Sequence, residues 1–155
     1  MNKKRVLFLC IGNSCRSPMA EAFARKYGAD VIEPLSAGLA PAAVVQPLTY
    51  KVLEDKRIPT EGLFPKDMSE VDDGNIDLIV NMSGLKLPYM PKGVEVRNWQ
   101  IQDPIGMEEE TYVAVRDRIE RETMLLILEL RRRSRDSQKK SSESESDRIS
   151  SGRTG

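Results

Sequence analysis

The sequence predicts an α/β fold, a three-layer sandwich in which helices flank a four-stranded parallel sheet. The first observation is that short apolar runs typical of strands alternate with helical patterns along the chain. The second is the run at residues 78–80, Leu-Ile-Val, which is apolar at every position, as in strands covered on both faces. Parallel strands joined by right-handed crossovers, with helices on both faces, satisfy both observations.

The expected strands are short and rich in apolar residues, and they lie at residues 6–9, 31–36, 77–82 and 94–99. The expected helices show a 3.6-residue apolar period and lie at residues 18–27, from residue 47 onward, and at residues 108–132. Gly28 ends the first helix and Pro47 opens the second. Residues 58–73 are less regular, with one short helix expected near Ser69.

The last helix has the clearest pattern in the chain. Its apolar stripe consists of Tyr112, Val115, Ile119, Leu126, Ile127 and Leu130. After it, residues 134–155 are almost all Ser, Arg, Lys, Glu and Asp, which bury too little apolar surface to offset the entropy of ordering the chain. We therefore expect one folded domain over residues 1–133 and a disordered polar tail over residues 134–155.

The composition excludes several classes of function. The chain has 24 basic and 24 acidic residues, so its net charge favours neither a nucleic acid nor a membrane as partner. It has no histidine, which removes Ser-His-Asp and Cys-His catalysis and most zinc sites. With two cysteines, and with an N-terminal apolar run too short for a signal peptide, the chain is expected in the cytoplasm.

A loop built for an oxyanion follows the first strand. Residues 10–18 read Cys-Ile-Gly-Asn-Ser-Cys-Arg-Ser-Pro and lead directly into the first helix. Gly and Asn tolerate positive φ, so successive backbone N–H groups can point into a concave nest, and a helix N-terminus also favours an anion. The residues expected to bind phosphate here are Ile11, Gly12, Asn13, Ser14, Cys15, Arg16 and Ser17.

Cys10 and Arg16 are the candidate catalytic residues of this loop. The positive field of the amides, the helix N-terminus and Arg16 should lower the pKa of the Cys10 thiol and leave a nucleophile at neutral pH. Arg16 can grip two oxygens of a tetrahedral oxyanion, and Ser17 can donate a hydrogen bond to the sulfur. Alternatively, Cys10 is one more buried strand residue and Arg16 a surface charge.

Residues 10–22 resemble the active-site signature of the low-molecular-weight protein tyrosine phosphatases and of the thioredoxin-coupled arsenate reductases that share their fold. The resemblance extends through residues 36–38, 78–82 and 99–104, and covers about residues 3–132. It implies that residues 1–133 form a phosphatase-like catalytic domain. It also implies the strand order 2-1-3-4, which places the Cys10 loop beside the switch point where open α/β sheets bind ligands.

The resemblance implies roles for further residues. Asp103 corresponds to the general acid, which later acts as base; read alone, its Asp-Pro pair also fits a turn. Asn13 and Ser36, with Ser17, correspond to residues that support the loop, although both could be ordinary turn and cap residues. Cys15 matches a cysteine that can pair reversibly with the nucleophile, or else packs beneath the loop.

The predicted function is hydrolysis of phosphotyrosine or related aryl or protein phosphate monoesters through a thiophosphate intermediate on Cys10. This chemistry needs no metal and no cofactor, and phosphate, arsenate and vanadate should compete for the nest. Two departures from the family pattern matter: Ile105-Gly106 follow Asp103-Pro104 in place of aromatic residues, and residues 82–88 contain no cysteine. The alternatives are an arsenate reductase that uses an external thiol and a non-catalytic phosphate- or phosphoprotein-binding module.

Overall fold

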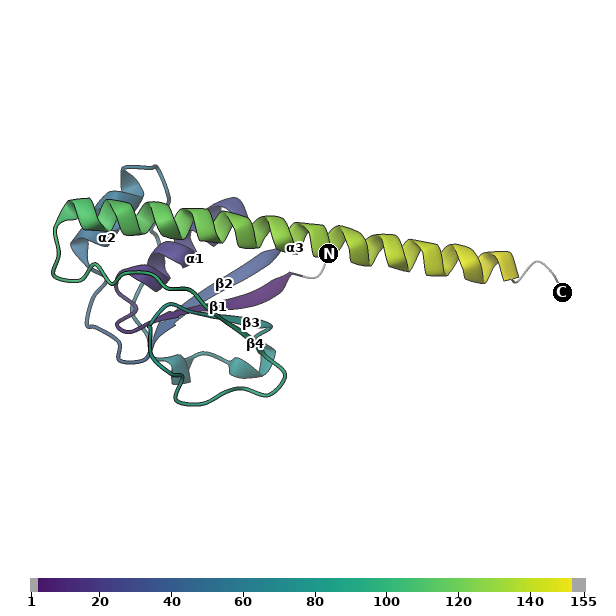
Figure 1. Cartoon of the computed structure of the whole chain (residues 1–155), viewed down its shortest axis with the longest axis horizontal. Helices are drawn as coiled ribbons and strands as arrows, with labels where there is room; N and C mark the ends of the chain where they lie inside the picture. The colour runs from purple at the N-terminus through teal and green to yellow at the C-terminus, as the bar shows by residue number, and fades with distance from the viewer. Residues whose placement is uncertain (1–2, 152–155) are drawn as a thin grey trace.

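The structure is a computed structural model that describes residues 3–151, except for the side chains of residues 73 and 144–151. Its centre is a sheet of four parallel strands, β1 (Lys4–Cys10), β2 (Ile32–Gly38), β3 (Leu78–Asn81) and β4 (Glu95–Asn98). They lie in the order β2-β1-β3-β4 (Figure 1), which confirms the predicted α/β class and strand order. All four carboxyl ends therefore meet at one edge of the sheet, where the Cys10 loop begins.

Three α-helices cover one face of the sheet: α1 (Arg16–Tyr27), α2 (Pro47–Glu54) and α3 (Glu109–Ser151). The opposite face is covered by an irregular segment that contains the short 3-10 helices η1 (Met68–Glu70) and η2 (Asp73–Asn75). The short helix expected near Ser69 is thus present. On this second face the flanking layer is made of single turns, because residues 58–76 hold no apolar stripe long enough for an α-helix.

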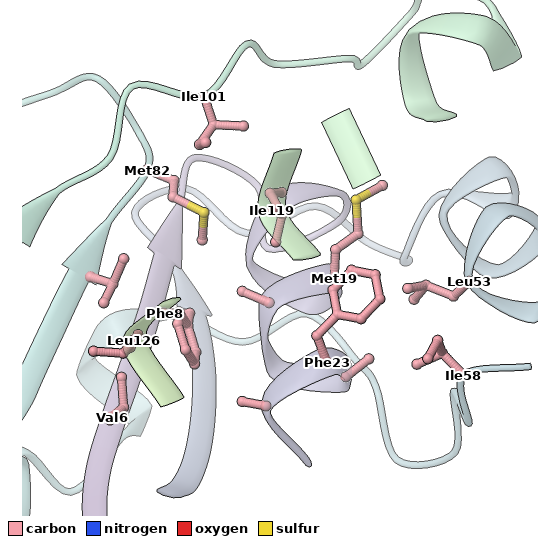
Figure 2. Close-up of a cluster of buried hydrophobic side chains, with 14 of the residues drawn as sticks. Val6, Phe8, Met19, Phe23, Leu53, Ile58, Met82, Ile101, Ile119 and Leu126 are labelled. Carbon is pink, nitrogen blue, oxygen red and sulfur yellow. The ribbon is translucent and has the colours of Figure 1, made fainter. Parts of the chain in front are cut away.

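The side chains of β1 alternate between two buried clusters. Val6 and Phe8 point into the larger cluster, beneath the helices, and Leu7 and Leu9 into the smaller one. Figure 2 shows the larger cluster, to which Phe8 of β1, Phe23 of α1 and Leu126 of α3 all contribute. The predicted stripe of α3 is buried in this cluster at every position, from Tyr112 to Leu130. The core therefore follows the periodicities of the sequence.

Close contacts at Gly28 and Arg131 lock α3 onto the body of the domain. A Cβ atom at Gly28 would lie 2.7 Å from Cγ1 of Ile127, so glycine lets the end of α1 and the middle of α3 approach each other. Arg131 forms a two-pronged ion pair with Asp30, with nitrogen–oxygen distances of 2.9 Å, and donates to the backbone oxygen of Tyr27 at 2.7 Å. This pair lowers the pKa of Asp30 through the hydrogen bonds from Arg131.

The helix α3 continues beyond residue 132, where the sequence pattern ends it. The structure keeps residues 133–151 helical, and the helix projects past the body of the domain (Figure 1). None of residues 131–143 is buried, and residues 135–143 are all exposed. Up to residue 143, where side chains are described, the extension buries no apolar face. The division into a folded domain at residues 1–133 and a disordered polar tail at residues 134–155 stays a prediction.

Neighbouring residues of α3 offer a matched test of this packing. Replacing the fully buried Ile127 by Ala should lower the free energy of unfolding by about 2–5 kcal/mol, since the change removes apolar contacts and leaves a cavity. The same truncation at Leu128, which is 48% exposed, should change it by less than about 0.5 kcal/mol. Urea unfolding followed by circular dichroism measures both, and equal effects would contradict the burial pattern.

Candidate active site

The loop between β1 and α1 carries the predicted nucleophile at its start. Cys10 is the last residue of β1 and is 2% exposed. Its sulfur lies 2.9 Å from Oγ of Ser17, and the backbone N–H of Ser17 donates to the same sulfur at 3.4 Å. The side chain and backbone of Ser17, in the first turn of α1, therefore both approach the Cys10 sulfur, as the sequence indicates for the hydroxyl.

Arg16, at the other end of the loop, is buried rather than at the surface. Its Nη1 donates to the backbone oxygen of Met82, after β3, and to that of Ile101, after β4, the second at 3.1 Å. Its Nη2 lies 3.3 Å from Oδ2 of Asp103. Its buried Nε has no hydrogen-bond partner among the described residues. One guanidinium thus joins the Cys10 loop to the loops after β3 and β4.

Asp103 lies at the same edge of the sheet and is partly exposed, at 35% of its side chain. Its Oδ1 accepts a hydrogen bond from the backbone N–H of Ile105 at 3.1 Å, while its Oδ2 faces Arg16. The carboxylate therefore forms the turn expected of an Asp-Pro pair and also reaches the guanidinium of the Cys10 loop, while its role as general acid stays a prediction.

Asn13 holds the loop from within. Its φ of 50° is in the left-handed region, which Asn tolerates better than most residues. Its Nδ2 donates to Oγ of Ser17 at 2.8 Å and to Oγ of Ser36 at 3.0 Å, and its Oδ1 accepts from the backbone N–H of Lys66 at 3.0 Å. Asn13, Ser17 and Ser36 therefore form one buried hydrogen-bonded group behind Cys10.

Sequence reasoning missed Glu21 as part of this group. The Glu21 side chain is 3% exposed, accepts a hydrogen bond from Oγ of Ser36 at 2.5 Å, and pairs with Arg25. The available signal is spacing, because Glu21 lies one helical turn after Ser17 and so on the same face of α1. Arg16 is oriented by the backbone carbonyl groups of Met82 and Ile101. Every residue has such a group, so the sequence could not show which residues would contact Arg16.

Gly38, at the end of β2, is a further residue of the site that the sequence did not point to. A Cβ atom there would lie 2.7 Å from the backbone oxygen of Ile11 and 2.9 Å from the backbone nitrogen of Asn13. Both neighbours are backbone atoms of the Cys10 loop, which cannot move aside without changing the shape of the loop. Glycine is therefore required at this position for the loop to rest against β2.

Cys15 is the second thiol of the loop and is 2% exposed. Its sulfur lies 3.6 Å from the hydroxyl oxygen of Tyr112 on α3 and 3.7 Å from Oγ of Ser14. Burial raises the pKa of the Cys15 thiol above its ordinary value. The site thus places Cys15 against α3, as a packed thiol that stays protonated at neutral pH.

The described part of the chain, residues 3–151, contains neither a cluster of metal ligands nor a helix suited to spanning a membrane. Within it, no three His, Cys, Asp or Glu side chains gather in a way that could hold a metal ion. No helix within residues 3–151 is both long and apolar enough to cross a membrane.

Comparison with known proteins identifies the family. The family profile for low molecular weight phosphotyrosine protein phosphatase matches residues 5–136. The chain belongs to this family. Its fold is similar to that of a low-molecular-weight protein tyrosine phosphatase from T. tengcongensis, with a TM-score of 0.72 and 27% identity over 82% of this chain and 99% of that one.

Members of the family with another named activity are similar to this chain as well. An arsenate reductase from Bacillus cereus is 37% identical over 125 residues, which are 76% of this chain and 90% of that protein. A glutaredoxin arsenate reductase from Synechocystis is 30% identical over 82% of this chain and 98% of that protein. A solved arsenate reductase in the phosphate binding state has a TM-score of 0.75 and 30% identity, over 82% and 98% of the two chains.

The contact at Gly38 predicts that a single methyl group disturbs the site. Gly38→Ala should lower the rate of Cys10 alkylation by iodoacetamide by about ten-fold or more, because the loop must move away from β2. Gly74→Ala is the control, since a Cβ there would meet only Oδ1 of Asp72 within 4 Å. Unchanged alkylation in Gly38→Ala would contradict the proposed close packing.

The two thiols should also differ in reactivity. At pH 7, iodoacetamide should modify Cys10 and leave Cys15 largely unmodified, because burial raises the pKa of Cys15, whereas the hydroxyl and backbone N–H of Ser17 favour negative charge on the Cys10 sulfur. The difference should narrow as the pH rises toward the pKa of Cys15, where its thiolate becomes populated. Peptide mass spectrometry after timed alkylation measures both sites, and faster modification of Cys15 would contradict this assignment.

Proposed function

We propose that this protein hydrolyses phosphate monoesters with Cys10 as nucleophile. The observation that carries the proposal is the convergence of three groups: a thiol at the start of the loop, a buried guanidinium at its end, and the Asp103 carboxylate 3.3 Å from that guanidinium. Each group has a role in phosphoryl transfer, and all lie at the edge where parallel sheets bind ligands.

In the proposed first step the Cys10 sulfur attacks phosphorus, an S–P bond forms, and the bond from phosphorus to the ester oxygen breaks. Hydrogen bonds from Ser17 favour negative charge on the attacking sulfur. Arg16, through the free Nε and through Nη2, and the backbone N–H groups of the loop would bind the other phosphoryl oxygens. Protonated Asp103 would give its proton to the leaving oxygen.

In the second step a water molecule attacks the phosphorus of the intermediate. Asp103, now a carboxylate, takes a proton from the water, the S–P bond breaks, and inorganic phosphate leaves with Cys10 again a thiolate. No metal or organic cofactor takes part in either step. The exposed position of Asp103 at the mouth of the site fits this exchange with water and with the leaving group.

An aryl or other apolar leaving group fits the surroundings of Asp103. Ile105 and Met107 follow it and are 48% and 44% exposed, so aliphatic surface stands where many family members carry aromatic residues. Such surface can pack against the ring of an aryl phosphate, although it offers no ring to stack on. We propose that the substrate is a small aryl phosphate or a phosphorylated protein. We also propose that the protein is located in the cytoplasm.

Arsenate reduction is the second candidate, and the names of the similar proteins favour it. Cys10 would attack arsenate and form a thiol–arsenic adduct, and two electrons must then come from further thiols. This chain has two cysteines in all, both in the loop, and residues 81–90 after β3 contain none. Because Cys15 packs against α3, reduction would need an external thiol, such as glutaredoxin or a small thiol. That thiol would attack the Cys10 sulfur, form a mixed disulfide, and release arsenic as arsenite when the S–As bond breaks.

Substitutions at the site test the hydrolytic mechanism. Cys10→Ser should abolish hydrolysis of p-nitrophenyl phosphate, because an alcohol is a far weaker nucleophile than a thiolate at neutral pH. Asp103→Asn should lower kcat by about 10²–10⁴-fold for alkyl phosphates and less for p-nitrophenyl phosphate, whose leaving group needs little protonation. Steady-state kinetics measures both, and full activity in Cys10→Ser would refute the proposal.

A parallel assay separates the two candidates. The same preparation is given arsenate with a thioredoxin system, a glutaredoxin system or glutathione alone, and arsenite is quantified. We expect hydrolysis of phosphate monoesters and little arsenite in any arm. Arsenite formed with glutaredoxin or glutathione and lost in Cys10→Ser, without phosphatase activity, would replace hydrolysis by the second candidate.

A further inference from the structure

A chain of hydrogen bonds leads from a buried carboxylate to the Cys10 sulfur. Glu21 accepts from Ser36 at 2.5 Å, Ser36 accepts from Asn13 at 3.0 Å, Asn13 donates to Ser17 at 2.8 Å, and Ser17 Oγ is 2.9 Å from the sulfur. Four of the five side chains are at most 2% exposed and Glu21 is 3% exposed. Water is therefore excluded from the links.

The direction of every donor in this chain follows from Glu21. An ionised carboxylate only accepts hydrogen bonds, so the single hydroxyl hydrogen of Ser36 is committed to Glu21. Ser36 Oγ is then an acceptor toward Asn13, whose amide orientation is also held by the N–H of Lys66 on its Oδ1. Both hydrogens of the Asn13 Nδ2 group are thus used, on Ser36 and on Ser17.

The consequence reaches the sulfur through Ser17. Because Ser17 Oγ accepts from Asn13, its own hydrogen can go to the Cys10 sulfur at 2.9 Å or to the backbone oxygen of Ala37 at 3.4 Å. The shorter contact, and the negative charge of a thiolate, favour the sulfur. Asn13 cannot turn over and compete for this hydrogen as long as Glu21 holds Ser36.

We propose that Glu21 is a positioning residue that sets the polarity of this chain and so keeps the Ser17 hydroxyl donating to Cys10. The Glu21 carboxylate pairs with Arg25, and the ammonium group of the half-buried Lys66 also interacts with it. Glu21 touches neither the substrate nor the sulfur. The inference rests on the proposed role of Cys10 as nucleophile.

Alkylation of Cys10 tests this without any substrate. Glu21→Leu removes the acceptor at similar volume, and Ser36→Ala breaks the chain while leaving the Glu21 charge in place. Each should lower the rate of Cys10 alkylation at pH 7, and kcat/KM for p-nitrophenyl phosphate, by about ten-fold, because the Ser17 hydroxyl is no longer held as a donor to the sulfur. Glu21→Gln, which retains an acceptor oxygen, should recover part of the loss. Glu33→Leu, at an exposed position of β2, is the matched control and should behave as wild type.

A double-mutant cycle shows whether Glu21 acts through Ser17. In a Ser17→Ala background, Glu21→Leu should change the rate of Cys10 alkylation and kcat/KM by less than about two-fold, since the last link is already absent. An equal effect in both backgrounds, or an unchanged rate of Cys10 alkylation in Glu21→Leu and Ser36→Ala, would overturn the inference. If Glu21→Leu does not fold by circular dichroism, Ser36→Ala decides. If the wild-type protein does not hydrolyse phosphate monoesters, the proposed function is refuted. The alkylation rates still test the role of Glu21, because they need no substrate.

Discussion

The burial of the Arg16 guanidinium is the constraint on which the site depends. A buried charge must be paired and hydrogen-bonded, and Arg16 meets this need with the carbonyl groups of Met82 and Ile101 and the carboxylate of Asp103. These partners come from the loops after β3 and β4, far from Arg16 in the sequence. Satisfying one side chain therefore draws three loops together, and places Asp103 at the mouth of the Cys10 loop.

The loop itself is held on its other side by polar and glycine contacts with β2 and the segment before η1. Ser36 and Gly38 of β2, and the backbone of Lys66, approach the loop from behind. The parallel register makes this possible, because Cys10 and Gly38 are partners at the same carboxyl edge of the sheet. The parallel register of β1 and β2 therefore also fixes where the Cys10 loop lies against β2.

Much of the site could be predicted because it is local. Cys10, Asn13, Arg16 and Ser17 lie within eight consecutive residues between a strand and a helix, so their spacing alone places them around one nest. Glu21 and Gly38 were not predicted as parts of the site, because a carboxylate on a helix and a glycine ending a strand usually have ordinary explanations. Only the short distance from Glu21 to Ser36, and the close approach of Gly38 to the backbone of Ile11, connect these two residues with the site.

The sequence by itself determined the alternation of strands and helices, the buried stripe of α3 and the loop that joins Cys10 to the first helix, because periodicity and local backbone preferences are properties of neighbouring residues. The tertiary structure decided the rest: the pairing of Arg16 with Asp103, the packing of Cys15 against Tyr112, and the thin covering of the second face of the sheet. These features join residues distant in the chain, and such contacts arise only when the whole core is packed.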